Sequence, residues 1–427
     1  MTYSEALAYI ASLEPRGWRL GLDRMAEFVG RAGLSGAVDG AERKYIHVAG
    51  TNGKGSVTAF LQSLLVEGGA VTGAFFSPYV VDPRERVQIG RDLISETQLA
   101  QLTAELREVA EAMDGTEFAG VTEFEFKTAL GFLAWRRSGV DWVALETGLG
   151  GRLDATNVVA PAASVIVSIG LDHQAILGDT IEKIAYEKAG IIKPGIPLVL
   201  GSVPEAAARV IREVAAEQHS PVWAFGHEIT WDAARRAVTT PEATFEGLEP
   251  SLQGLWQPHN LSLAVGALVA SRFQLTSSTA KAGAANAYAP GRYEKKLWKG
   301  RTVILDGAHN ADSAAALPST LKSDLGPTAR VVLLTNMLLG HDPVAFYTPF
   351  AGIADSAVIA PVEFHRRRDP AETVSVLKGL GVPAEAVGSV DDALERCLEL
   401  PGPETPILVT GSFYLVGEVV RAMSGSE

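Results

Sequence analysis

The stretch that decides the fold reads Tyr45-Ile46-His47-Val48-Ala49-Gly50-Thr51-Asn52-Gly53-Lys54-Gly55-Ser56. Its first five residues form a short apolar run rich in β-formers, which predicts a buried strand. The glycines that follow let backbone N–H groups approach a phosphate, and a helix is expected to begin near Ser56. A strand, a glycine-rich turn and a helix in this order predict a phosphate-binding loop.

The loop departs from the strict G-x-x-x-x-G-K-[ST] pattern at two places. Val48 occupies the position of the first glycine, and Gly55 separates Lys54 from Ser56. An ordinary strand-to-helix turn is therefore the alternative interpretation. In a phosphate loop, Lys54 would reach the terminal phosphate and Ser56 would bind Mg²⁺. The predicted nucleotide contacts in this loop are Asn52, Gly53, Lys54, Gly55 and Ser56.

Further strands and helices alternate along the chain. Short apolar runs closed by Gly, Asp or Thr predict buried parallel strands at 45–49, 142–145, 164–169, 197–200, 302–305, 331–334 and 407–409. Apolar residues at helical spacing predict helices at 57–66, 96–113, 125–137, 180–189, 260–271 and 311–321. This alternation predicts an α/β fold with a mainly parallel sheet.

The length of 427 residues favours two domains, because a single hydrophobic core stops growing well below that size. The boundary is expected at the small-residue stretch 277–290, which Gly291-Arg292 follows and after which the alternation restarts. We predict a P-loop-type nucleotide-binding domain at 1–290 and a smaller, Rossmann-like, doubly wound domain at 291–427.

Composition excludes several classes of protein. The formal charge is -13, from 37 Lys and Arg against 50 Asp and Glu, and would repel nucleic acid. We interpret the basic run Arg366-Arg367-Arg368 as a solvated loop, with attraction of a small anion as the alternative. Cys397 is the only cysteine, which excludes an internal disulfide. With neither a secretory signal nor a membrane-spanning stretch, we expect a cytoplasmic protein.

The glycine between Lys54 and Ser56 resembles the ATP loop of the Mur ligase superfamily, in particular that of dihydrofolate synthase and folylpolyglutamate synthase. Further motifs are similar to this family in the same order along nearly the whole chain. They are Gly21-Leu22-Asp23-Arg24, Phe76-Ser77-Pro78-Tyr79, Glu85-Arg86-Val87, Thr122-Glu123-Phe124-Glu125, residues 146–157, Asp172-His173-Gln174, Glu187-Lys188-Ala189-Gly190-Ile191, Pro290-Gly291-Arg292, Asp306-Gly307-Ala308-His309-Asn310 and Thr410-Gly411-Ser412-Phe413-Tyr414.

The resemblance implies a reaction. A substrate carboxylate attacks the γ-phosphate of ATP to give an acyl phosphate, and the amine of L-glutamate then displaces phosphate. Such chemistry needs electrostatic clamps more than a protein nucleophile. The implied substrate is dihydropteroate or a reduced folate, and we favour a bifunctional enzyme that acts as a monomer. The alternatives are a monofunctional synthase of either kind and a nucleotide-binding regulator without turnover.

The resemblance also implies metal ligands and catalytic residues. Two Mg²⁺ ions would be held by Ser56, Ser77, Glu146, His173 and Lys188. Glu146 follows the strand 142–145, at the sheet edge where open α/β folds place ligands, although it could also be a surface loop acid. His173 alone would more often be structural. The plain interpretation of Lys188 is a solvated lysine near a helix C-terminus, whereas the resemblance implies that its ε-amine is carbamylated.

The remaining site residues follow from the same resemblance. Asn260, Arg292 and Asp306 would contact the nucleotide, and His309 would assist at the γ-phosphate or place glutamate. The implied pteroate contacts are Leu22, Asp23, Arg24, Thr122, Phe124, Leu153, Asp154 and Ala155. The chain departs from the family at Gly340-His341-Asp342, where the family usually has Asp-Lys-Asp, so a cation in that loop is lost or becomes titratable.

Overall fold

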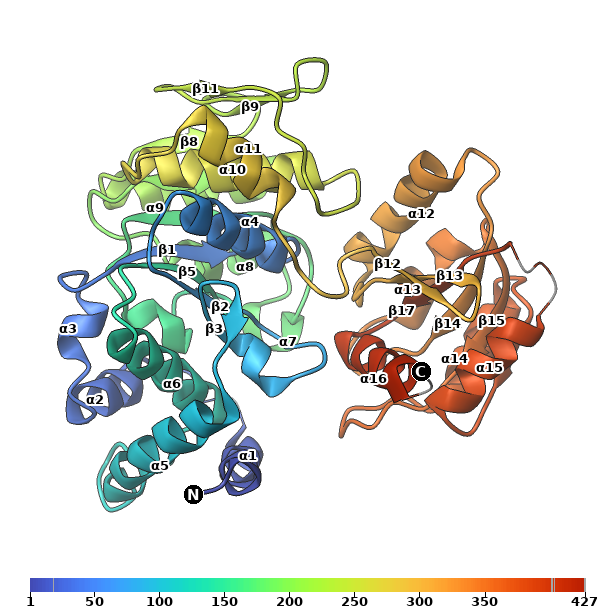
Figure 1. Cartoon of the computed structure of the whole chain (residues 1–427), viewed down its shortest axis with the longest axis horizontal. Coiled ribbons are helices and arrows are strands. Elements are labelled where there is room, and N and C mark those ends of the chain that lie inside the picture. The colour runs from blue at the N-terminus through green and yellow to red at the C-terminus, as the bar shows by residue number, and fades with distance from the viewer. Residues whose placement is uncertain (18, 401, 403, 426–427) are drawn as a thin grey trace. The chain divides into compact units, whose positions relative to one another are not determined.

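A computed structural model describes residues 1–17, 19–400, 402 and 404–425. The chain divides into two compact units, which are described separately (Figure 1). Unit 1 comprises Met1–Pro78, Arg84–Ser251 and Pro258–Tyr288. Unit 2 comprises Tyr79–Pro83, Leu252–Gln257 and Ala289–Glu427. The longest segment of unit 2 begins after Tyr288, close to the predicted boundary at residue 290. The two short earlier segments of unit 2 were not predicted.

Unit 1 is built on an eight-stranded sheet in the order β4-β3-β2-β5-β1-β6-β7-β8. The six strands from β2 to β8 in this order are parallel, and β3 and β4 form an antiparallel edge. The strands are β1 (Lys44–Ala49), β2 (Thr72–Phe75), β3 (Val87–Ile89), β4 (Asp92–Leu93), β5 (Trp142–Glu146), β6 (Ala163–Ile166), β7 (Leu198–Leu200) and β8 (Val222–Ala224). The predicted parallel sheet is confirmed.

Helices cover both faces of this sheet (Figure 1). The helices of the unit are α1 (Tyr3–Ser12), α2 (Asp23–Arg31), α3 (Ser35–Val38), α4 (Lys54–Glu67), α5 (Glu96–Met113), α6 (Glu123–Arg137), α7 (Gln174–Leu177), α8 (Ile181–Ala189), α9 (Glu205–Glu217), α10 (Gln257–Ala270) and α11 (Ser277–Ala285). A small antiparallel sheet of β9 (Thr230–Asp232), β10 (Ala237–Thr239) and β11 (Thr244–Phe245) completes the unit.

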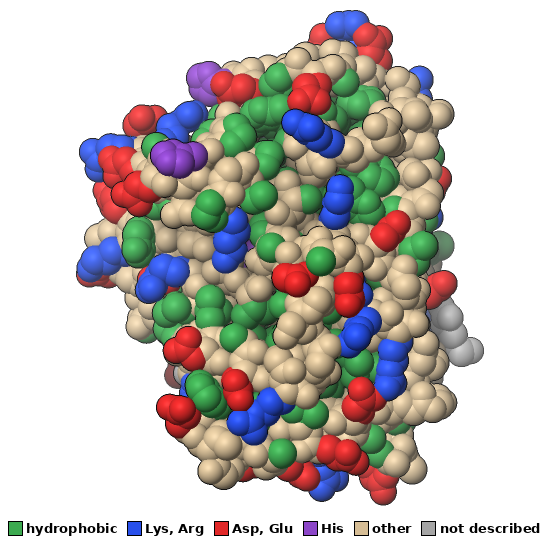
Figure 2. Space-filling view, turned by 90° about the vertical axis from the view of Figure 1, so that its left-hand side faces the viewer, with side chains coloured by type: hydrophobic (Ala, Val, Ile, Leu, Met, Phe, Trp, Pro, Cys, Tyr) green, Lys and Arg blue, Asp and Glu red, His purple; other side chains and the backbone are tan. Residues whose placement is uncertain are grey.

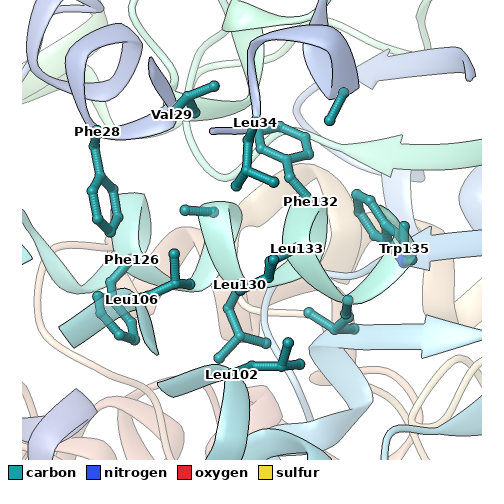
Figure 3. Close-up of a cluster of buried hydrophobic side chains, with 14 of the residues drawn as sticks. Phe28, Val29, Leu34, Leu102, Leu106, Phe126, Leu130, Phe132, Leu133 and Trp135 are labelled. Atoms are coloured by element: carbon teal, nitrogen blue, oxygen red, sulfur yellow. The ribbon is translucent and has the colours of Figure 1, made fainter. Parts of the chain in front are cut away.

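The core of unit 1 is centred on α6. Phe126, Leu130 and Leu133 recur at helical spacing and are buried together with side chains of α2 and α5 (Figure 3). Trp135, at the end of the same helix, is fully buried and contacts the ring of Tyr45 on β1. This packing ties α6 to the strand that leads into the phosphate loop.

Unit 2 has a six-stranded sheet in the order β12-β13-β17-β14-β15-β16, antiparallel only at β12. The strands are β12 (Glu294–Trp298), β13 (Arg301–Leu305), β14 (Val331–Thr335), β15 (Ala354–Ile359), β16 (Ala384–Ala386) and β17 (Ile407–Thr410). One apolar cluster joins it to α15 (Val390–Glu399) and α16 (Phe413–Gly425). Another joins it to α12 (Ala311–Leu325), α13 (Pro343–Tyr347) and α14 (Pro370–Gly379). Two clusters on one sheet are the doubly wound arrangement predicted.

The stretch 277–290, where the boundary was expected, holds α11 over most of its length, and the two units divide near its end, after Tyr288. Two other sequence-based expectations were wrong in detail. The predicted strand 164–169 ends early, at Ile166, because the chain then turns toward the phosphate loop. The phosphate-loop helix begins at Lys54 rather than near Ser56.

Within the described residues, no helix is long and apolar enough to cross a membrane. Figure 2 shows acidic and basic side chains interspersed over one face of the molecule, without a broad basic patch on that face. The basic run lies in the loop after β15, where Arg366 and Arg367 are exposed and Arg368 pairs with Glu372. Arg366 and Arg367 agree with the interpretation of that run as a solvated loop, whereas the side chain of Arg368 is only 11% exposed and donates to the His341 carbonyl.

Candidate active site

The phosphate loop connects β1 to α4 and requires glycine at position 53. Gly53 is the N-cap of α4 and has a φ of +85°, in the left-handed region. A Cβ at this position would lie 2.9 Å from Cγ1 of Val167 and 3.1 Å from Oδ1 of Asn260. Asn260, a predicted nucleotide contact on α10, therefore lies directly against the loop.

Two hydroxyls that the sequence analysis missed hold the loop in place. Ser168 Oγ accepts a hydrogen bond from the Asn52 N–H at 2.9 Å and donates to the Asn52 carbonyl at 2.8 Å. Thr51 Oγ1 accepts from the Gly170 N–H at 3.0 Å. In the sequence, Ser168 stands near the end of the apolar run 164–169, and we had assigned that run to a strand. These bonds fix the backbone whose N–H groups would meet a phosphate.

Two lysines converge on the first carbonyl of this loop. Lys54 Nζ donates to the Gly50 carbonyl at 3.0 Å, and Lys188 Nζ donates to the same oxygen at 2.9 Å. Lys188 lies in the last turn of α8 and is only 4% exposed, so the interpretation as a solvated lysine is wrong. Burial, reinforced by the charge of Lys54, lowers the pKa of Lys188 to about 7.

Glu146 ends β5 and is 1% exposed, which excludes the surface-acid interpretation. One of its carboxylate oxygens accepts a hydrogen bond from the Ser77 N–H at 3.1 Å. Ser56 is buried in the first turn of α4. Hydroxyl and carboxylate oxygens are the ligands that Mg²⁺ prefers, so this donor set fits a Mg²⁺ ion that also contacts substrate phosphates. The described residues contain no group of three or more His, Cys, Asp and Glu side chains that could hold a metal ion.

His173 lies at the start of α7 in a strained conformation. Its φ of +50° is uncommon for a residue other than glycine. Its N–H donates to the carboxylate of the buried Asp172 at 2.8 Å, and its Nε2 lies 3.9 Å from the same oxygen. Strain of this kind clusters at functional sites, so it supports a functional role for His173.

The predicted pteroate residues lie on several elements of unit 1. Thr122 caps α6 and bonds to Glu125, which pairs with Arg24 of α2 at 2.9 Å. Phe124 covers Gly148, where even a Cβ would clash with its ring. Leu22 and Asp23 begin α2, and Leu153, Asp154 and Ala155 lead into the short helix η3 (Ala155–Val158). Among the residues that the structure describes, the donors to the carboxylate of Asp154 all belong to its own loop.

Three predicted residues belong to unit 2, at the carboxyl end of β13. Burial raises the pKa of Asp306 to about 6, and its carboxylate accepts from the N–H groups of Tyr293 and Ala308. Arg292 lies over the ring of Phe413, 4.2 Å from its centroid. His309 Nδ1 donates to the Gly307 carbonyl at 2.9 Å. These residues form a polar group of their own within unit 2.

Comparison with known proteins identifies the family. Residues 291–413 match the family described as "Mur ligase, glutamate ligase domain". Dihydrofolate synthase/folylpolyglutamate synthase of Bacillus subtilis is 34% identical over 440 residues, covering 99% of both chains. The chain belongs to the dihydrofolate synthase/folylpolyglutamate synthase family of Mur ligases. It is thus an ATP-dependent ligase, as the phosphate loop had suggested.

Solved structures of this family share the whole fold. Escherichia coli FolC in complex with DHPP and ADP has a TM-score of 0.89 at 30% identity, covering 100% of this chain and 98% of that one. The bifunctional Yersinia pestis synthase, complexed with AMPPNP and Mn ion, has a TM-score of 0.86 at 28% identity, covering 99% and 98%. Both likenesses extend over unit 1 and unit 2, so the two-unit α/β architecture is that of the family.

Proposed function

We propose that this ligase joins L-glutamate to the carboxylate of dihydropteroate, and also to reduced folates, through an acyl phosphate. The observation that carries the proposal is the meeting of Lys54 and Lys188 on the Gly50 carbonyl of the phosphate loop. The Lys54 cation at this edge of the loop suits the charge that develops as a phosphoryl group moves from ATP to a carboxylate, and the buried Lys188 amine lies beside it.

In this proposal the loop N–H groups and Lys54 bind the ATP phosphates, with Asn260 beside them. Mg²⁺ would be held by Ser56 and Glu146, with Ser77 and His173 as the further candidate ligands, and would neutralise phosphate charge. Arg292 and Asp306 stay the predicted nucleotide contacts, and His309 the predicted contact of the γ-phosphate or of glutamate. The carboxylate attacks the γ-phosphorus and ADP leaves; the glutamate amine then attacks the acyl carbon, releasing phosphate and a proton.

Lys188 is proposed to act as a carbamate. Carbamylation needs a neutral amine, which attacks CO₂ and loses a proton to give an anion. A pKa of about 7 makes much of the amine neutral at physiological pH, whereas an ordinary lysine is almost fully protonated. The resulting carboxylate would suit a second Mg²⁺. Carbon-13 NMR after addition of labelled bicarbonate is expected to show a carbamate signal that Lys188→Met abolishes; an unchanged signal would contradict the assignment.

The pteroate is proposed to lie near Phe124 and the loop that carries Leu153, Asp154 and Ala155. An aromatic ring beside a tight glycine loop suits a flat heterocycle. Two similar proteins have names that point the same way, one for both synthase activities and one for a complex with DHPP. These names support dihydropteroate as a substrate beside reduced folates, and acceptance of both would make the enzyme bifunctional. Expectations of a monomeric state and a cytoplasmic location stay predictions.

The test is a product assay with MgATP and either dihydropteroate or tetrahydrofolate, each with and without L-glutamate. We expect glutamate-dependent release of ADP and a product heavier by one glutamate residue from both acceptors. Product from one acceptor alone would establish a monofunctional synthase. Nucleotide binding without product from either acceptor would contradict the proposal and indicate a regulator.

A further inference from the structure

Three buried polar side chains are linked by hydrogen bonds, beginning on β1, the strand that leads into the phosphate loop. His47 on β1 is fully buried, and its Nε2 lies 2.8 Å from Oγ1 of Thr156 in η3. Thr156 Oγ1 donates to Oδ1 of Asp154 at 2.5 Å. His47, Thr156 and Asp154 are 0%, 0% and 5% exposed, so water does not compete for these bonds. We call this group the buried triad.

The carboxylate of Asp154 is saturated by its own loop. Its Oδ1 accepts from the N–H and the hydroxyl of Thr156, and its Oδ2 accepts from the N–H groups of Gly148 and Leu149. An ionised carboxylate has about four acceptor positions, and four donors occupy them. Although burial raises the pKa of Asp154, only the ionised form accepts all four bonds. Little capacity remains for a substrate donor.

The hydroxyl of Thr156 determines which ring nitrogen of His47 carries the proton. Because that hydroxyl gives its proton to Asp154, its oxygen must accept one from His47, which places a proton on Nε2. His47 Nδ1 is buried and has no hydrogen-bond partner within the described part of the chain, as expected for an unprotonated nitrogen in an apolar setting. Burial lowers the pKa of His47 to about 3, so the imidazole stays neutral.

The loop held by the buried triad touches the parts of the proposed site. It begins directly after Glu146, and the Thr147 N–H donates to the Val48 carbonyl of β1 at 2.9 Å. Further along, the Arg152 N–H donates to the Glu187 carbonyl at 2.7 Å. Asn157 Nδ2 donates to the Gly190 carbonyl at 3.0 Å. The loop is thereby fixed to the end of α8 that carries Lys188.

We infer that His47 and Thr156 are positioning residues of the ligase reaction, which hold Asp154 as a fixed anchor for the loop between Glu146 and η3. In this arrangement Asp154 affects substrate binding by holding the loop in position, and its own carboxylate is not the substrate contact. This inference rests on the proposed function for its kinetic consequence. Its structural content, the direction of each hydrogen bond in the buried triad, does not depend on that function.

The kinetic test compares Thr156→Val with Thr156→Ser. Valine keeps the volume but removes the hydroxyl, so we expect kcat/KM for the pteroate acceptor to fall on the order of 10- to 100-fold, as small misplacements do. ADP affinity should change less than about threefold, because Ser168 and Thr51 hold the phosphate loop independently. Serine restores the hydroxyl and should restore kcat/KM.

Thr103→Val is the matched control, because Thr103 is a fully buried threonine on α5 and its hydroxyl has no hydrogen-bond partner among the described residues. It should leave kcat/KM unchanged. If Thr156→Val only lowers the unfolding temperature while the folded protein keeps its kcat/KM, the positioning role is overturned. The same holds if serine fails to restore activity in a folded protein.

The spectroscopic test separates this inference from the proposed function. Nitrogen-15 NMR of the wild-type chain should show His47 as the neutral tautomer with a proton on Nε2, unchanged between pH 5.5 and 8.5. Thr156→Val should shift that signal, and Thr103→Val should not. A proton on Nδ1, or a histidine that titrates near neutral pH, would overturn the triad. Both outcomes can be read even if the wild type forms no glutamylated product.

Discussion

Burial of Lys188 makes the stability of the metal-free protein depend on pH. Its pKa is about 7 in the folded chain and about 10.4 in an unfolded one. Between these values the unfolded chain binds more protons, so the free energy of unfolding rises with pH. In CO₂-free buffer we predict that, from pH 7.5 to 9.5, urea unfolding shows a gain for wild type over Lys188→Met on the order of 1 kcal/mol per pH unit.

If wild type gains no stability over Lys188→Met across that window, Lys188 binds its proton in the folded chain as it does in the unfolded one, and the prediction is wrong. Lys183→Met is the control, because Lys183 lies on the same helix and its ion pair with Asp179 is exposed. Its curve should run parallel to that of wild type over the same window.

Lys188 also supports a prediction about turnover. Lys188→Met removes the proposed carbamate but leaves the loop glycines and Lys54 in place. We predict a fall in kcat of about 10²- to 10³-fold, the usual cost of losing one electrostatic stabiliser, with ADP affinity retained. Steady-state kinetics and calorimetric titration of ADP measure the two effects. Lys183→Met should match wild type in both, and a Lys188→Met enzyme with near-normal kcat would refute the role.

The sequence predicted some site residues from position alone and others not at all. Glu146 follows an apolar run, so its place at the carboxyl end of a strand could be predicted. The burial of Lys188 could not, because the carbonyl that it meets belongs to Gly50, 138 residues earlier in the chain. Ser168 was hidden for a similar reason, since its partner Asn52 is distant in sequence.

At the scale of elements, the start of α4 depends on Gly53. We predict that Gly53→Ala weakens ATP binding by at least tenfold, because the new Cβ would press on Val167 and Asn260. Gly69→Ala is the matched control. Gly69 lies two residues beyond the other end of α4, has a φ of +83° against +85°, and has open space around it.

Both variants should lose about 1–2 kcal/mol of stability from the positive φ. ADP titration should detect weaker binding only for Gly53→Ala. Equal affinity in the two variants would show that close packing at Gly53 does not shape the nucleotide site.

Elements with uninterrupted apolar runs could be predicted, whereas others could not. The predicted strands at 45–49, 331–334 and 407–409 match β1, β14 and β17 to within one residue at each end. β2 reads Thr-Gly-Ala-Phe, and its Gly73 lies under Trp135, where any Cβ would clash. β15 begins Ala-Asp-Ser and gains its burial from neighbouring strands. Such strands form because of tertiary contacts that local patterning does not show.

At the scale of the whole molecule, unit 2 depends on a segment more than two hundred residues earlier in the chain. Val80 is 6% exposed within the apolar cluster of β13, β14 and β17, and Arg421 donates to the Val81 carbonyl at 3.1 Å. We predict that Val80→Ala destabilises unit 2 by about 1.5–3 kcal/mol, from lost apolar burial.

Hydrogen exchange should locate this loss in β13, β14 and β17 while leaving β1 and β5 protected. Val71→Ala, at an exposed valine in the same part of the chain, is the control and should change neither group of strands. A loss confined to β1 and β5 would mean that the segment 79–83 stabilises unit 1 instead.

The measurement that tests the central claim most directly follows oxygen from the acceptor into phosphate. Dihydropteroate labelled with oxygen-18 in its carboxylate is incubated with MgATP and L-glutamate. The masses of the glutamylated product and of the released phosphate are then measured by mass spectrometry. The account predicts a product heavier by one glutamate residue and one labelled oxygen in the released phosphate. A glutamylated product with unlabelled phosphate would contradict the acyl phosphate, and labelled acceptor recovered unchanged would contradict ligation itself.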